Sequence, residues 1–141
     1  MVSDKSSDAQ VKLIPAPGEW ERLRLLCADL ESGRSPRVDE DLRDYLRKVA
    51  LQTGHAPDVV AQLSVSDRGL FELAREARKR VRLGSRRLMA AMSAADNAVL
   101  AGNADAARTV LYEVVDNEPV PLYRDQARLY LRGLGLSPTG E

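Results

Sequence analysis

Apolar residues recur at three- and four-residue steps along most of the chain, which is the pattern of amphipathic helices. The spacing predicts a first helix that starts near residues 17–19 and stops at Gly33, a suitable left-handed cap. A second helix is predicted from about Val38 to the residues before Gly54. The segment PDVVAQLS predicts a short third helix with Pro57 at its first position. No segment alternates strictly between apolar and polar residues, so the sequence predicts an all-α fold.

The most regular pattern lies in the middle of the chain and predicts one long helix over about residues 67–101, with Ser66 as its N-cap. Its apolar and small residues alternate steps of four and three in a heptad-like seam, namely Leu70, Ala74, Ala77, Val81, Gly84, Leu88, Ala91, Ala95 and Ala98. A helical glycine costs about 1 kcal/mol relative to alanine, so Gly84 could act as a hinge. Continuity is favoured because Gly84 falls on the seam, where small residues let a neighbouring helix approach closely.

Two further helices follow the Gly102-Asn103 break, over about residues 104–117 and 121–133. Their predicted inward positions are Ala107, Val110, Leu111, Val114, Tyr123, Ala127, Tyr130 and Leu134. The window 88–121 has the tetratricopeptide period and that motif's small residues and closing proline. Shifting the window back by one period loses the pattern, and a stable array needs about three repeats. The expected architecture is a compact bundle of five to six helices, with one long central helix and a tetratricopeptide-like C-terminal hairpin.

Length and composition fit a single helical domain over residues 19–135, between a flexible leader (1–18) and a disordered tail (136–141). A chain of 141 residues can bury a core without metals or disulfides. Basic and acidic residues balance at 21 each, so no overall charge favours nucleic acid or a membrane surface. The single Cys27 lies among apolar residues and is expected to be a buried, reduced thiol. Without an apolar run or a signal peptide, we expect a cytoplasmic protein that does not associate with membranes.

Two stretches carry a family resemblance: RKRVRLGSRRLMAAM (78–92) and LAGNADAARTVLYEVVDNEPVPLYRDQA (100–127). Their GSRRLM core, AGNADAAR turn and PVPLYR block, with Trp20, Leu23 and Arg24 near the N-terminus, resemble the DUSAM domain, a paralogous family of myxobacterial proteins. The resemblance covers roughly residues 19–134. It implies a helical fold and a bacterial origin, and it brings no assigned catalytic residues.

The sequence contains no catalytic constellation, so we expect a protein that is not an enzyme and that binds no cofactor or metal. His55 is the only histidine, whereas metal sites are normally clusters of ligands. Ser85 lies in an arginine-rich helix and lacks the strand–turn–helix context of a nucleophile elbow. Asp39, Glu40 and Asp41 are better explained as the first turn of a helix than as an acid/base pair.

A basic cluster in the predicted long helix is the strongest candidate for a binding surface. It contains Arg75, Arg78, Lys79, Arg80, Arg82, Arg86 and Arg87. Five of these share one helical face away from the apolar seam, namely Arg75, Arg78, Lys79, Arg82 and Arg86. This face could bind an acidic protein or follow a phosphate backbone. Alternatively, the face is solvated or is paired with acids of neighbouring helices, such as Asp39, Glu40, Asp41 or Asp44.

The favoured function is a cytoplasmic helical module that binds another protein, as an adaptor, an inhibitor or an immunity-type protein, with a toxin or a restrained enzyme as possible partners. The candidate partner-binding residues are Arg75, Arg78, Lys79, Arg82, Arg86, Tyr112 and Arg124. Tyr123 and Tyr130 lie on the inward stripe and are expected in the core. Two alternatives remain open: a nucleic-acid-binding regulator that uses the Arg75–Arg87 face, and a homo-oligomeric structural protein sealed by the small-residue seam.

Overall fold

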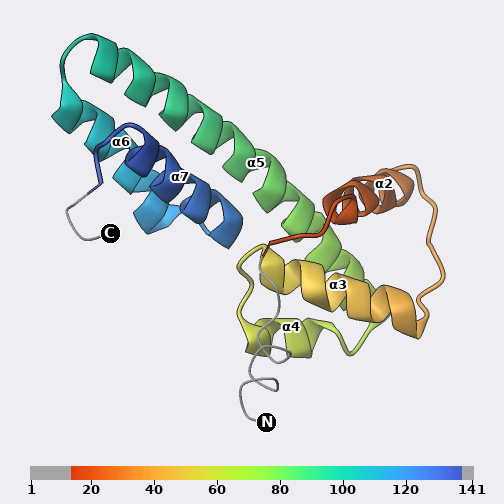
Figure 1. Ribbon diagram of the computed structural model, residues 1–141. Helices are drawn as coiled ribbons and strands as arrows, with labels where there is room; N and C mark the ends of the chain where they lie inside the picture. The colour runs from red at the N-terminus through yellow and green to blue at the C-terminus, as the bar shows by residue number, and fades with distance from the viewer. Residues whose placement is uncertain (1–13, 138–141) are drawn as a thin grey trace. The chain divides into compact units, whose positions relative to one another are not determined.

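Six helices make up residues 14–137, the part of the chain that the computed structural model describes (Figure 1). They are α2 (Glu19–Glu31), α3 (Glu40–Gln52), α4 (Pro57–Leu63), α5 (Asp67–Leu100), α6 (Ala104–Asn117) and α7 (Pro121–Gly133). No strand occurs in this part of the chain, so the all-α prediction and its long helix are confirmed. Residues 1–13 of the predicted leader and 138–141 of the predicted tail lie outside the described residues. The chain divides within α5, between Arg80 and Val81, into an N-terminal and a C-terminal unit, each described by itself.

Side-chain caps mark the start of three helices, with Asp39 before α3, Ser66 before α5 and Asn103 before α6. The Asp39 carboxylate accepts a hydrogen bond from the Leu42 N–H at 2.8 Å and caps α3. Helix α3 therefore begins one residue after Asp39, and the predicted start at Val38 is two residues too early. Before α5, the Ser66 hydroxyl oxygen accepts from the Gly69 N–H at 3.0 Å, as expected of the predicted N-cap. Among residues 14–137, no helix combines the length and the apolar character needed to cross a membrane.

The seam of α5 is buried along one continuous helix, as predicted. Each of its nine predicted residues is buried except Ala98, which is half-buried. A Cβ atom added at Gly84 would lie 2.7 Å from the Glu118 Oε2 atom and 2.7 Å from Cδ2 of the Tyr123 ring. The missing side chain at Gly84 therefore makes room for a carboxylate and an aromatic ring against the helix.

The N-terminal unit packs α2 and α3 against the first part of α5 around one buried cluster, formed by Leu23, Leu26, Cys27, Leu42, Tyr45, Leu46, Val49, Leu70, Ala74 and Ala77. Helix α4 closes a smaller cluster of Ala50, Val60 and Leu73. Cys27 is buried, as predicted, with its Sγ 3.5 Å from the Ala74 carbonyl oxygen. Burial raises the pKa of the Cys27 thiol, which disfavours the reactive thiolate.

The C-terminal unit consists of the rest of α5 with α6 and α7, which lie alongside this part of the helix (Figure 1). Tyr123 is buried, as predicted, and its hydroxyl donates a hydrogen bond to the Val81 carbonyl oxygen at 3.1 Å. Tyr130 is only half-buried, and its hydroxyl donates to the Asp96 carboxylate at 2.6 Å. Leu131, rather than Tyr130, is the fully buried residue at this level of α7. The two tyrosine hydroxyls thus form hydrogen bonds from α7 to α5 at two positions.

Replacing Gly84 with alanine is expected to destabilise the protein, although alanine favours a helix over glycine by about 1 kcal/mol. The added methyl group would overlap the Tyr123 ring and the Glu118 carboxylate, both buried, and such overpacking costs about 1–3 kcal/mol. Urea denaturation measures the change. Gly133→Ala is the matched control, because nothing lies within 4 Å of a Cβ atom there. A rise in stability for both variants would contradict the close approach at Gly84.

Candidate functional site

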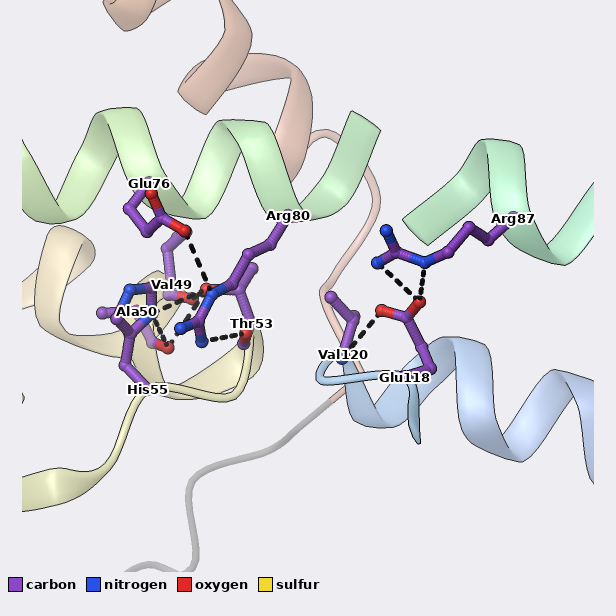
Figure 2. Close-up of polar contacts among 9 residues, drawn as sticks. All are labelled: Val49, Ala50, Thr53, His55, Glu76, Arg80, Arg87, Glu118 and Val120. Atoms are coloured by element: carbon purple, nitrogen blue, oxygen red, sulfur yellow. Dashed lines mark hydrogen bonds and ion pairs between the residues drawn. The ribbon is translucent and has the colours of Figure 1, made fainter. Parts of the chain in front are cut away.

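The seven cations of the basic cluster form two groups with different roles. Arg80 and Arg87 reach polar groups of their own units, as Figure 2 shows. The other five make no ion pair with any residue between 14 and 137, and they are Arg75, Arg78, Lys79, Arg82 and Arg86. All five are exposed except Arg78, which is half-buried. These five residues are called the free cations below.

The acids that could have covered the cluster pair elsewhere. Asp41 lies 3.1 Å from Arg22, and Asp44 lies 3.4 Å from Arg47. Asp39 caps its own helix. The interpretation that these three acids pair with the basic cluster is therefore wrong, and Glu40 makes no ion pair with a residue between 14 and 137. The alternative of a solvated face agrees with the exposure of four of the five free cations. On α2, the pKa of the Glu21 carboxyl is lowered first by its hydrogen bond from Arg24 and then by the charges of Arg24 and Arg78.

Arg80 closes the C-terminal end of α3 in the N-terminal unit. Its Nη1 donates to the Thr53 carbonyl oxygen at 3.0 Å, and its Nε lies 3.5 Å from the Glu76 carboxylate (Figure 2). A cation at this position stabilises the helix, because the last carbonyl groups of a helix carry partial negative charge. The ring of His55 lies against the same turn, with Nδ1 3.1 Å from the Ala50 carbonyl oxygen. Both side chains therefore have structural roles at the end of α3.

The surroundings of His55 favour its neutral form. Burial and then the nearby charge of Arg80 lower the pKa of His55 below its ordinary value of 6.5. Between residues 14 and 137, no three histidine, cysteine, aspartate or glutamate side chains gather where they could hold a metal ion.

Glu118 is a buried charged residue that the sequence reasoning missed. It follows α6, and its side chain is only 1% exposed. Its Oε1 accepts hydrogen bonds from Arg87 Nε at 3.1 Å and Nη2 at 2.9 Å, and its Oε2 accepts from the Val120 N–H at 3.0 Å (Figure 2). A buried carboxylate is tolerated when its oxygens are hydrogen-bonded and its charge is paired. The only signal in the sequence was one acid inside the otherwise apolar turn EPVP.

Two of the free cations, Arg82 and Arg86, lie beside a groove between α5 and α7 of the C-terminal unit. This α5–α7 groove has a volume of about 610 Å³, and its wall includes Leu88, Met89, Met92, Tyr123, Leu129 and Tyr130. Arg82 precedes Ser85, another wall residue, by three positions, and Arg86 precedes Met89 by three, so both cations neighbour the wall on the helix surface. The groove wall is therefore mostly apolar, with Arg82 and Arg86 near one end of its α5 side, whereas the Asp96 carboxylate near the other end accepts a hydrogen bond from the wall residue Tyr130.

The remaining predicted site residues do not join this groove. Tyr112 lies on α6 and Arg124 on α7; both are half-buried, and neither lines the groove. Arg75 and Lys79 line a different pocket, of about 520 Å³, in the N-terminal unit with His55. The structure thus brings Arg82 and Arg86 to an apolar groove, and leaves Tyr112 and Arg124 outside it.

Residues 18–134 match a family model described as "Protein of unknown function (DUF2379)". This span is close to the roughly 19–134 of the DUSAM resemblance. No curated protein and no solved structure matches the chain. The tetratricopeptide-like character of the C-terminal hairpin stays a prediction.

Replacing Arg87 with methionine is expected to destabilise the protein by about 1–2 kcal/mol, because the buried Glu118 carboxylate keeps only the Val120 N–H as a donor. The guanidinium is half-exposed, which reduces the loss below that of a fully buried pair. The matched control is Arg86→Met, which removes the same charge from the neighbouring position without removing an ion pair. Thermal denaturation should show a lower melting temperature for the first variant only. Equal losses would mean that the pair does not stabilise the fold.

Acidification is expected to destabilise the folded protein as His55 becomes protonated. The pKa of His55 is lower in the folded than in the unfolded chain, so the unfolded chain binds more protons below pH 6.5. This contribution to stability is complete above pH 6.5 and is lost as the pH falls through the folded pKa. With one histidine in the chain, an NMR titration of tag-free protein follows a single imidazole. A midpoint at or above 6.5 would contradict this assignment, and His55→Gln should remove this part of the pH dependence.

Proposed function

The chain belongs to the family of proteins of unknown function DUF2379, and we propose that it acts without catalysis, as a helical module that binds an acidic partner protein. The observation that carries the proposal is the set of free cations on α5. Like charges four residues apart on a helix repel each other by a few tenths of a kcal/mol, at roughly 0.2–0.5 per pair. Arg75 and Lys79, Arg78 and Arg82, and Arg82 and Arg86 have this spacing. A negatively charged partner would relieve that repulsion.

Two surface properties favour a protein over nucleic acid as the partner. Every aromatic side chain of the chain is buried or half-buried, so no fully exposed ring is offered for base stacking. By contrast, Met89 and Leu129 are 67% and 57% exposed near Arg82 and Arg86. Exposed apolar side chains next to unpaired arginines are typical of a protein-binding surface, where arginine and methionine are enriched.

The proposed binding surface would be the same for an adaptor, an inhibitor or an immunity-type protein. The same proposal includes membership of the DUSAM family and a cytoplasmic location. Membership of the DUSAM family is supported because the family match and the DUSAM-like motifs span nearly the same residues. The cytoplasmic location is supported by the single cysteine, Cys27, which is free and buried, as is usual for proteins of reducing compartments.

Affinity capture from a lysate of the source cells tests the proposal. The tagged chain is compared with a variant in which Arg75, Lys79, Arg82 and Arg86 become glutamate. A protein partner retained by the wild-type chain should be lost from the variant, and it should dissociate as salt is raised, because salt screens exposed charges. Treating the lysate with nuclease should not change the capture.

The control reverses four exposed arginines outside the cluster, Arg24, Arg34, Arg37 and Arg47. Three of these are in exposed ion pairs, which contribute little to stability, and circular dichroism checks that the control is folded. It changes the net charge by the same amount and should keep the partner. Loss of the partner in both variants would show a non-specific charge effect. Capture that depends on nuclease-sensitive material, together with a salt-dependent gel shift on duplex DNA, would favour the nucleic-acid alternative. A monomeric mass by light scattering at high concentration would remove the homo-oligomer alternative.

A further inference from the structure

We propose that the α5–α7 groove binds an amphipathic helix of the partner protein, with apolar residues in the groove and acidic residues against Arg82 and Arg86. This inference rests on the proposed function, because it names the segment that a protein partner contributes. It concerns the C-terminal unit alone.

The wall of the groove is suited to apolar side chains. Leu88, Met89 and Met92 come from α5, and Tyr123 and Leu129 come from α7. Methionine side chains are flexible and polarisable, and they adapt to apolar helices of different sequence. Met89 and Leu129 are more than half exposed on opposite walls, so binding of a partner would remove their apolar surface from water, which favours association.

The dimensions of the groove match a short helix. The wall residues of α7 and its C-cap extend from Tyr123 to Leu134, which corresponds to about 16 Å at a rise of 1.5 Å per residue. About three turns of a partner helix span this length. Such a helix would place side chains at positions i, i+4 and i+7 along the groove, as helices bound in grooves do.

The unpaired arginines beside the groove favour a partner helix with acidic residues. Arg82 and Arg86 lie four residues apart on the α5 edge of the groove and have no ion-pair partner among residues 14–137. A groove on the opposite side of this part of α5, against α6, is lined by Arg87, Glu113 and Glu118, and Arg87 is already paired with Glu118. Arg86 also precedes Ala90 of this second groove by four positions, but the wall there contains the exposed Glu113 carboxylate, which would repel an acidic flank. The combination of apolar wall and unpaired arginines occurs at the α5–α7 groove.

Gly133 allows the groove to be filled without disturbing the fold. It lines the wall as the last residue of α7, and nothing lies within 4 Å of a Cβ atom added there. A large side chain at this position would occupy the space of the partner helix. Alanine would leave most of that space free.

The test uses the full chain with ¹³C-labelled methionine methyl groups. Of its three methionines, Met89 and Met92 line the groove, and Met1 serves as an internal reference. The probe is a capped 18-residue helical peptide with leucine at i, i+4, i+7 and i+11 and glutamate on the flanks. A second peptide carries lysine at the flanking positions. The acidic peptide should shift the Met89 and Met92 signals and leave Met1 unchanged.

Three variants identify the interaction. Arg82→Glu combined with Arg86→Glu should weaken binding of the acidic peptide about tenfold or more, which corresponds to two lost charge pairs. Gly133→Trp should abolish the methionine shifts, and Gly133→Ala should bind as the wild type does. Circular dichroism and melting temperature check that each variant is folded.

Equal binding of the acidic and basic peptides, or persistence of the shifts in Gly133→Trp, would overturn the inference. So would methionine signals that change with protein concentration without peptide, because a second copy of the chain would then occupy the groove. Absence of peptide binding, with capture of a partner still lost on charge reversal of α5, would overturn the groove assignment and leave the proposed function standing. If the acidic peptide does not bind and charge reversal of α5 does not change the capture of a partner, the proposed function is overturned as well.

Discussion

The packing of the C-terminal unit depends on the absence of a side chain at Gly84. The space is filled by the Tyr123 ring and the Glu118 carboxylate, and neither group can withdraw freely. The Tyr123 hydroxyl is bonded to the Val81 carbonyl, and the Glu118 carboxylate is bonded to the Val120 N–H and to Arg87. The glycine costs the helix about 1 kcal/mol, whereas hydrogen bonds to a charged group contribute about 1.5–3 kcal/mol each. The hydrogen-bonded groups that the glycine accommodates therefore contribute more stability than the glycine costs the helix.

In the N-terminal unit, polar contacts of aromatic side chains join α2 to α3. The Tyr45 hydroxyl donates to the Glu19 carbonyl oxygen, and the Arg22 guanidinium stacks 4.1 Å above the Tyr45 ring. Burial raises the pKa of Tyr45 to about 12, so the phenol stays protonated and remains a donor. Trp20 Nε1 donates to the fully buried Gln52 amide at 3.1 Å. Aromatic residues with one polar atom thus join the helices of each unit.

The parts of the fold that the sequence predicted well depend on residues close together along the chain. The seam of α5, the Ser66 cap and the left-handed Gly33 need only local spacing and backbone preferences, and all three were predicted. The start of α3 was placed two residues early, because acids at Asp39 to Asp41 suit both a cap and a first turn. Capping geometry alone distinguishes the two roles.

The candidate site was predicted only in part, because its roles depend on contacts between distant segments. Seven neighbouring cations look equivalent in the sequence, and Arg87 differs from Arg86 only through Glu118, 31 positions further on. Similarly, the position of Arg80 near the end of α3 depends on the packing of α3 against α5. The groove itself requires the side-by-side placement of α5 and α7, which no local pattern encodes.

The adjacent residues Arg86 and Arg87 have different physical roles. Successive residues of a helix point about 100° apart, so Arg87 is committed to Glu118 while Arg86 faces outward. A change at the outer position alters what the surface attracts and leaves the interior ion pair intact. Substitutions on the outer face of α5 can therefore change the surface charge with little effect on folding. One helix thus combines an interior ion pair with a surface that can vary independently of it.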